Sequence, residues 1–251
     1  MHATEFEFRN RFWFICLTYF LGFGCYWLDP RNTVAMLVRW IFNGYDPHLQ
    51  SLAARHAFQA LFAVSALLVT AAAWIRTWAG AYLRSEVVHD PAVHTEKLVA
   101  DGPYRHLRNP LYFGNMLLAI GMAVLASRTG SVILILGNVL IVLRLMGREE
   151  MALAQVQGDA YRSYVAAVPR FWPSLRPRLG SRGLQPKWLQ AFLGEAWMWT
   201  FGLNGWILVW KLDDRIYYRI LCVSAVPYFL MRMMQHRSNR NNRKKLHSDS
   251  F

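Results

Sequence analysis

The residues best suited to chemistry in this chain gather in DGPYRHLRNPLYFGN, residues 101–115, directly before a long apolar run. Asn109 and Pro110 predict a helix start, because Asn favours the cap position and Pro gives up an N–H that would lack a partner. A helix start also presents free N–H groups and the positive end of the helix dipole, which bind carboxylates and phosphates. Positive charge and aromatic rings come from Tyr104, Arg105, Arg108 and Tyr112. The segment indicates an anion site, and it also fits a purely structural role at a helix start.

A second charged group, Arg148, Glu149 and Glu150, follows the next apolar run. Only SRTG, residues 127–130, separates the two apolar runs, so their helices must form a tight antiparallel hairpin. The hairpin returns both glutamates to the level of Asn109. In many membrane proteins such a charged group only ends a span, and that interpretation also fits here.

Together, the two groups match a ligand that carries a carboxylate at one end and a cation or sugar hydroxyl groups at the other. S-adenosylmethionine is a ligand of this kind. Its sulfonium is attracted to aromatic faces, which are available from Tyr104, Tyr112, Tyr161 and Tyr164. The three cysteines lie in apolar runs without the spacing of metal ligands, so no metal site is predicted.

Composition and apolar runs indicate the fold that positions these groups. A net charge of +13 combined with 55% hydrophobic residues fits a membrane protein with basic cytoplasmic faces. It argues against a soluble nucleic-acid-binding protein. We expect an all-α, polytopic membrane bundle of about six spans. These are Phe12–Leu28, Ala57–Trp78, Leu111–Ala126, Ser131–Met146, Ala196–Trp210 and Ile216–Met234, of which the last two also fit a re-entrant or interfacial hairpin.

Four further features have simpler interpretations. Residues 34–45 are too short to span a membrane and predict an interfacial helix. Gly114 and Gly121 lie on one face of the third span, where they would let a neighbouring backbone approach closely. Arg76, near the end of the second span, is expected to extend toward the cytosolic interface. The basic tail, RSNRNNRKK, is expected to be solvated and to contact anionic headgroups.

The distribution of positive charge orients the bundle. With six spans, both termini lie on one side together with residues 79–110 and 147–195, and this side carries 18 of the 28 Lys and Arg residues. The opposite loops carry six. The positive-inside rule therefore places Asn109, Glu149 and Glu150 at the cytosolic face. The membrane would be a bacterial inner membrane or that of the endoplasmic reticulum.

The two polar groups also resemble the signatures of a known family. LVADGPYRHLRNPLYFG resembles the G-x-Y-R-x-x-R-[HN]-P-x-Y-x-G motif of the integral-membrane methyltransferases, which include isoprenylcysteine carboxyl methyltransferases and phospholipid N-methyltransferases. REEMALAQVQGDAYRSYVAAVPRFWP resembles their second motif, E-E-x-x-L…G-x-x-Y-x-x-Y…V-P-R-x-x-P. The resemblance is strong over residues 97–177, loose before them, and absent after residue 180.

The resemblance implies a membrane enzyme that transfers a methyl group from S-adenosylmethionine to a lipid or lipid-linked acceptor. The cofactor-binding residues that it implies are Tyr104, Arg108, Asn109, Pro110, Tyr112, Glu149 and Glu150. We expect three segments: N-terminal spans with an interfacial helix (1–96), a methyltransferase core (97–180), and a C-terminal membrane hairpin with the basic tail (181–251). Asn109 stands where many members have His, so this position offers no imidazole base.

Methyl transfer to a carboxylate or thiolate depends on positioning and a dry pocket more than on acid–base help. An amine acceptor would also have to lose a proton, and Glu149 or Glu150 is the expected base. Arg144 lies one turn inside the fourth span, where a charge is costly. It would either neutralise an acceptor carboxylate or extend to the interface. Arg144 and Glu150 are therefore the predicted catalytic residues.

Two other functions fit parts of the pattern. An NADPH-dependent lipid or sterol reductase has a similar Arg-His-Pro-Asn-Tyr signature, but this chain has Asn109 and Leu111 where that signature has His and Asn. A non-catalytic membrane protein such as a channel would spread polar residues through several spans, whereas here they gather at one end. The sequence leaves open the acceptor, the choice among O-, N- and S-methylation, and the oligomeric state.

Overall fold

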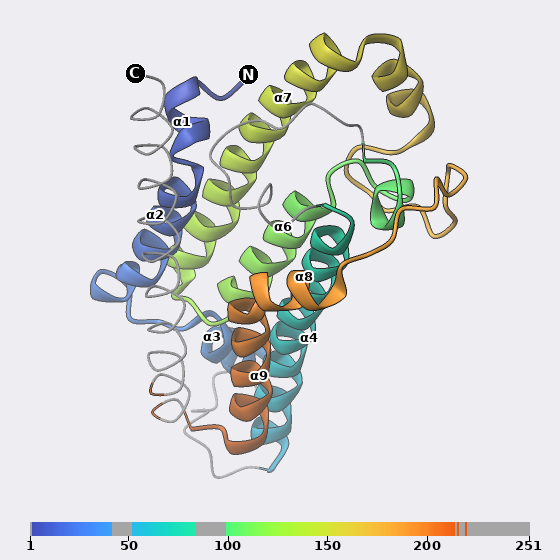
Figure 1. Ribbon diagram of the computed structural model, residues 1–251. Helices are drawn as coiled ribbons and strands as arrows, with labels where there is room; N and C mark the ends of the chain where they lie inside the picture. Colours follow the sequence, from blue (N-terminus) through green and yellow to red (C-terminus); the bar gives the residue numbers. More distant parts are fainter. Residues whose placement is uncertain (1, 42–51, 84–98, 214, 216–218, 220–251) are drawn as a thin grey trace, which may run out of the picture.

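The computed structural model describes residues 2–41, 52–83, 99–213, 215 and 219 (Figure 1). Within these ranges the regular elements are helices, apart from one isolated β-bridge between Asn32 and Ser127. The predicted all-α class is therefore confirmed for this part of the chain. Apart from residue 219, the predicted sixth span, 216–234, and the basic tail lie outside the described residues.

Five of the helices overlap the first five predicted spans, although α4 and α7 are longer than predicted, and α3 overlaps the predicted interfacial helix as far as Ile41. The elements are α1 (Glu5–Arg9), α2 (Arg11–Gly24), η1 (Cys25–Trp27), α3 (Thr33–Ile41), α4 (Leu52–Tyr82), η2 (Gly102–Arg105), α6 (Pro110–Ala123), α7 (Arg128–Ala167), α8 (Trp188–Gly194) and α9 (Ala196–Lys211). By length and composition, α4 and α7 could each cross a membrane, and α6 is a shorter apolar helix. A helical membrane protein is therefore supported, but the full number of six spans is not confirmed.

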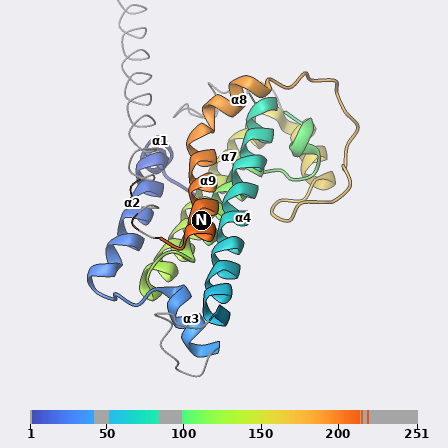
Figure 2. The same cartoon turned by 90° about the horizontal axis from the view of Figure 1, so that it is seen from below.

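The helices form a bundle in which α2, α7, α6, α4 and α9 each pack against the next (Figures 1 and 2). The contact between α6 and α4 is close because α6 presents glycines to it. A Cβ at Gly121 would lie 2.9 Å from Val69 Cγ2 and 3.1 Å from the Ser65 carbonyl oxygen. The Ser65 hydroxyl donates to the Gly121 carbonyl at 2.7 Å. The predicted close approach at Gly114 and Gly121 is thus confirmed.

The outer surface of the bundle is apolar. Large hydrophobic side chains point outward from several helices, including Phe20 on α2 (75% exposed), Leu136 on α7 (62%) and Trp210 on α9 (73%). Soluble monomers rarely expose apolar side chains over so many faces. A surface of this kind matches helices that are surrounded by lipid.

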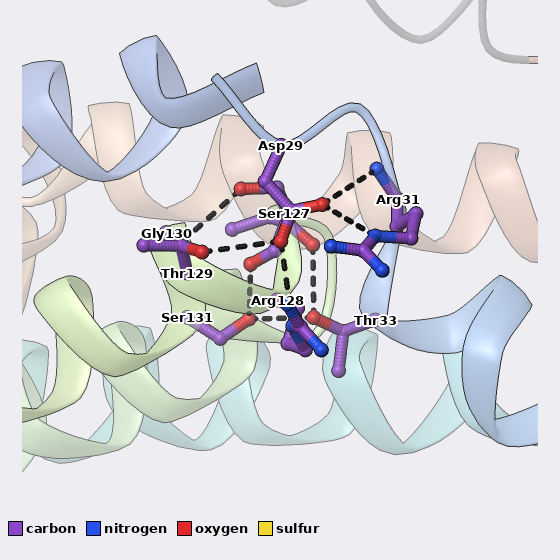
Figure 3. Close-up of polar contacts among 9 residues, drawn as sticks. Asp29, Arg31, Thr33, Ser127, Arg128, Thr129, Gly130 and Ser131 are labelled. Atoms are coloured by element: carbon purple, nitrogen blue, oxygen red, sulfur yellow. Dashed lines mark hydrogen bonds and ion pairs between the residues drawn. The ribbon is translucent and has the colours of Figure 1, made fainter. Parts of the chain in front are cut away.

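The turn of the α6–α7 hairpin is fixed to the loop between α2 and α3 (Figure 3). The buried Asp29 carboxylate accepts hydrogen bonds from Arg31 Nε at 2.8 Å and from the Thr129 hydroxyl at 3.1 Å. The side chain of Ser127 caps α7 by accepting from the Gly130 N–H at 3.1 Å. These bonds hold the end of the hairpin that is opposite to the motif residues, so the hairpin is anchored away from the site.

The prediction for Arg76 is wrong. Its side chain does not extend to an interface. It points into the bundle, where it is 9% exposed, and its Nη2 lies 2.7 Å from Glu195 Oε1. Glu195 is itself 2% exposed and lies between α8 and α9. The guanidinium can stay charged inside the bundle because a carboxylate from a distant part of the chain pairs with it.

Candidate active site

The two sequence motifs meet at one end of the bundle. η2 and the start of α6 carry the first motif, and the end of α7 with the chain after it carries the second (Figure 1). A backbone hydrogen bond joins them directly, since the Arg108 N–H donates to the Pro169 carbonyl at 2.9 Å. Just beyond the second motif, the Arg178 N–H donates to the Arg105 carbonyl at 2.8 Å. Residues that are far apart in the sequence therefore form a single structural unit.

Asn109 and Glu150 connect the motifs through their side chains. The Asn109 amide nitrogen donates to Glu150 Oε1 at 2.9 Å. Asn109 occupies the cap position of α6 and Pro110 the first helical position, as predicted. The cap itself differs from the expectation, because the Asn109 side chain makes no capping hydrogen bond and reaches the carboxylate instead. The start of α6 thus keeps N–H groups that no side chain caps.

Glu150 is the point where positive charge converges. Arg108 Nη1 lies 3.4 Å from its Oε1, and Arg170 Nη2 lies 3.0 Å from its Oε2. Arg170 Nε also donates to Oε1 at 3.2 Å. Both carboxylate oxygens are therefore engaged by arginines that come from opposite motifs.

Glu149 faces a different part of the site. Its carboxylate lies at the hydroxyl of Tyr112, on the first turn of α6, and the positive charge of Arg11 from the start of α2 acts on both groups. Tyr112 is buried, and its ring packs with Phe8 and Met116. The two adjacent glutamates consequently have separate surroundings, one between two arginines and the other beside a phenol.

A turn at Gly158 brings two more tyrosines into the site. Gly158 interrupts α7 with φ 51° and ψ −124°, a conformation that side chains with a Cβ rarely adopt. The last part of α7 folds back after this residue, and the Tyr164 hydroxyl donates to the Tyr104 carbonyl at 2.8 Å. The Tyr161 hydroxyl lies beside the Arg108 guanidinium. The glycine of the second motif is therefore explained by a backbone requirement.

Asp101 fastens the chain that closes this end. Burial alone would raise the pKa of Asp101, but its carboxylate accepts from the N–H groups of Arg182 and Leu184 and from the Ser181 hydroxyl, at 2.9 to 3.1 Å. These hydrogen bonds hold the pKa of Asp101 below its usual value. The carboxylate stays ionised and keeps residues 181–184 against the start of η2.

Comparison with protein families gives a match for the central part of the chain. Residues 60–160 match the family described as phospholipid methyltransferase. Neither the curated proteins nor the solved structures gave a match to the chain.

This part of the chain is similar to phospholipid methyltransferases.

The family match confirms the predicted resemblance. It spans most of α4, all of α6, α7 as far as residue 160, and both motif glutamates, and it ends just before Tyr161. The family implies a methyltransferase that acts on lipid in a membrane, in agreement with the apolar outer surface.

The residues of the family segment fit S-adenosylmethionine, the methyl donor that is typical of this family. Arg108 Nε is buried without a hydrogen-bond partner among the described residues, and it lies beside the uncapped start of α6. Both features suit a carboxylate or phosphate. The carboxylates of Glu149 and Glu150 suit an amino group or ribose hydroxyls, and the rings of Tyr104 and Tyr112 suit a sulfonium.

Arg144 lies outside this cluster in the structure. Its Nη2 pairs with Glu7 Oε2 at 2.8 Å, and its carbonyl accepts from the Ala3 N–H at 3.0 Å. An acceptor carboxylate would have to replace Glu7 at Arg144. The catalytic role of Arg144 therefore stays a prediction that requires a change of partner.

Sequence reasoning missed two arginines of the site. Arg170 stands in the V-P-R part of the second motif, so its place in the motif could have indicated it. Arg11 lies outside both motifs, and the sequence gives no signal that α2 places it near Glu149. Of the predicted residues, the structure brings together those of the two motifs and leaves Arg144 paired with α1.

Proposed function

We propose that this chain is an S-adenosylmethionine-dependent methyltransferase that transfers a methyl group to a lipid or lipid-linked acceptor. The observation that carries the proposal is the contact of Asn109 with Glu150 at 2.9 Å, because it joins the anion-binding helix start to the paired carboxylates. The excess of Lys and Arg in the segments on this side supports a cytosolic face for the site. The cofactor would then arrive from the cytosol and the acceptor from the bilayer.

Each polar residue has a binding role in this proposal. Arg108 and the N–H groups at the start of α6 would hold the anionic end of the cofactor. Glu149 and Glu150 would hold its amino group or ribose, and Tyr112 would place an aromatic face near the positive sulfur. The cofactor supplies the electrophilic methyl group. The protein would contribute mainly orientation, for which effective molarities correspond to about 7–11 kcal/mol.

The surroundings of the two glutamates favour different tasks. Both oxygens of Glu150 are engaged by Arg108 and Arg170, which makes this carboxylate a fixed anchor. Among the described residues, Glu149 contacts the Tyr112 phenol and lies near Arg11. For an amine acceptor, Glu149 is therefore the better placed of the two to take up the proton. A carboxylate or thiolate acceptor would need no base.

The test is cofactor binding to the purified protein in detergent or nanodiscs, with labelled S-adenosylmethionine. Charge-assisted hydrogen bonds contribute about 1.5–3 kcal/mol each, so the double variant Glu149→Ala, Glu150→Ala should weaken binding by at least about 100-fold. Asp159→Ala is the matched control, because this acidic side chain lies on the same helix and is 95% exposed. It should bind like the wild type.

Two results would overturn the proposal. The first is wild-type protein that binds NADPH but not S-adenosylmethionine, which would favour the reductase. The second is unchanged cofactor binding by the double variant.

Mass spectrometry identifies the acceptor. Lipids incubated with the wild type and cofactor should contain a species that is one methyl group heavier than in a control without cofactor.

A further inference from the structure

Arg76 and Glu195 form a buried ion pair between the family segment and a part of the chain beyond it. Arg76 Nη2 lies 2.7 Å from Glu195 Oε1, and Arg76 Nε donates to Glu195 Oε2 at 2.9 Å. The pair is therefore bidentate, with side chains 9% and 2% exposed. Arg76 lies within the family match, whereas Glu195 lies 35 residues beyond its end at 160.

The Nη1 nitrogen of Arg76 is directed at the start of α6. Its Nη1 donates to Asn115 Oδ1 at 2.9 Å and to the Leu111 carbonyl at 3.4 Å. Leu111 stands between Pro110 and Tyr112, two of the predicted cofactor-binding residues. One guanidinium thus connects Glu195 to the first turns of the helix that begins at the site.

The last glycine of the first motif makes this connection possible. A Cβ at Gly114 would lie 2.5 Å from Arg76 Cγ and 3.3 Å from the Ala72 carbonyl oxygen. The stem of Arg76 therefore crosses α6 in the space that the glycine leaves free. No larger residue fits there without displacement of the guanidinium or of α4.

Glu195 is held in place by the docking of α8 and α9 on α4. The Lys187 N–H donates to the Ala81 carbonyl at 2.8 Å, and Trp199 Nε1 donates to the Thr77 hydroxyl at 3.0 Å. The corner between α8 and α9 is thereby fixed at the end of α4 that faces the site (Figure 1).

We propose that Arg76 is a positioning residue, held by Glu195, that fixes the start of α6 in the orientation that the site requires. The inference rests on the proposed function. A buried ion pair adds little stability compared with apolar residues of similar size. The pair instead serves to orient α6. The planar guanidinium has several N–H donors in fixed directions, so one side chain can bind the Glu195 carboxylate, the Asn115 side chain and the Leu111 carbonyl at once. The α8–α9 segment would then serve the site without contributing a residue to it.

The test separates positioning from stability. The double variant Arg76→Met, Glu195→Leu replaces the pair by apolar side chains and should keep the unfolding temperature close to that of the wild type. Binding of S-adenosylmethionine should nevertheless weaken about tenfold or more. Arg76→Lys, which keeps the charge but not the fork, should show the same loss of affinity. Thr77→Val is the control, since it removes a bond between α4 and α9 that does not reach α6.

Hydrogen–deuterium exchange of the protein without cofactor gives an independent result. We expect faster exchange over residues 109–115 in the double variant and in Arg76→Lys, and wild-type exchange there in Thr77→Val. Unchanged exchange in both Arg76 variants would overturn the inference, whatever the binding data show. If the Arg76 variants show the expected faster exchange but the wild type does not bind S-adenosylmethionine, only the proposed function is overturned.

Discussion

The Gly158→Ala variant isolates the contribution of one backbone turn to the candidate site. With φ 51° and ψ −124°, this residue adopts a conformation that costs a side chain with a Cβ about 1–3 kcal/mol. An added Cβ would meet no atom within 4 Å. The cost is therefore conformational, and the chain can relieve it by straightening α7.

Straightening α7 would move Tyr161 and Tyr164 away from Tyr104. A cofactor that binds only when these tyrosines are in place would then have to offset the conformational cost at residue 158 with part of its binding free energy. We expect its dissociation constant to rise roughly 5- to 150-fold, which corresponds to about 1–3 kcal/mol. The assay is equilibrium binding of labelled S-adenosylmethionine, together with thermal unfolding to show that the variant is folded.

Gly180→Ala is the matched control for this measurement. Gly180 also has no atom within 4 Å of an added Cβ, and it is absent from the glycines with positive φ. It should therefore bind the cofactor like the wild type. Equal affinities of the Gly158→Ala and Gly180→Ala variants would refute the role of the turn.

Two further predictions concern contacts at the same end of the bundle. Tyr164→Phe removes a buried hydrogen bond to the Tyr104 carbonyl and should lower the free energy of unfolding by about 1–3 kcal/mol. Chemical denaturation measures this difference, and an unchanged free energy of unfolding would show that the bond adds no stability. The Arg144 guanidinium, together with the Thr4 N–H, lowers the pKa of Glu7 to about 2. The stability difference between wild type and Glu7→Gln should therefore be full above pH 4.5 and vanish as pH falls toward 2, as followed by thermal unfolding. A difference that persists at pH 2 would contradict this linkage.

Several features of the fold could be predicted because they depend on neighbouring residues in the sequence. The apolar runs locate five of the described helices, and the short segment 127–130 requires the hairpin of α6 and α7. The order Asn109–Pro110 marks the start of α6, since cap and first-turn preferences act within a few residues. Helix ends were predicted less well: α7 continues to Ala167 because its polar residues still favour a helix.

The partners of the charged side chains could not be predicted in this way. Arg76 has the same surroundings in sequence as an arginine at a membrane interface, yet it is buried and pairs with Glu195 at the corner between α8 and α9. Arg144 pairs with Glu7, although the expected partner was either an acceptor carboxylate or the membrane interface. In each case the partner lies more than a hundred residues away.

The sequence by itself determined which residues could form a site and on which hairpin they stand, because motif spacing and apolar periodicity are local properties. Only the tertiary structure decided how those residues are paired. It directs the amide of Asn109 to Glu150 instead of the helix cap, and it gives Glu149 and Glu150 different neighbours. The physical reason is that the energy of a charge depends on its nearest opposite charge and on its burial, and both are set by packing between distant segments.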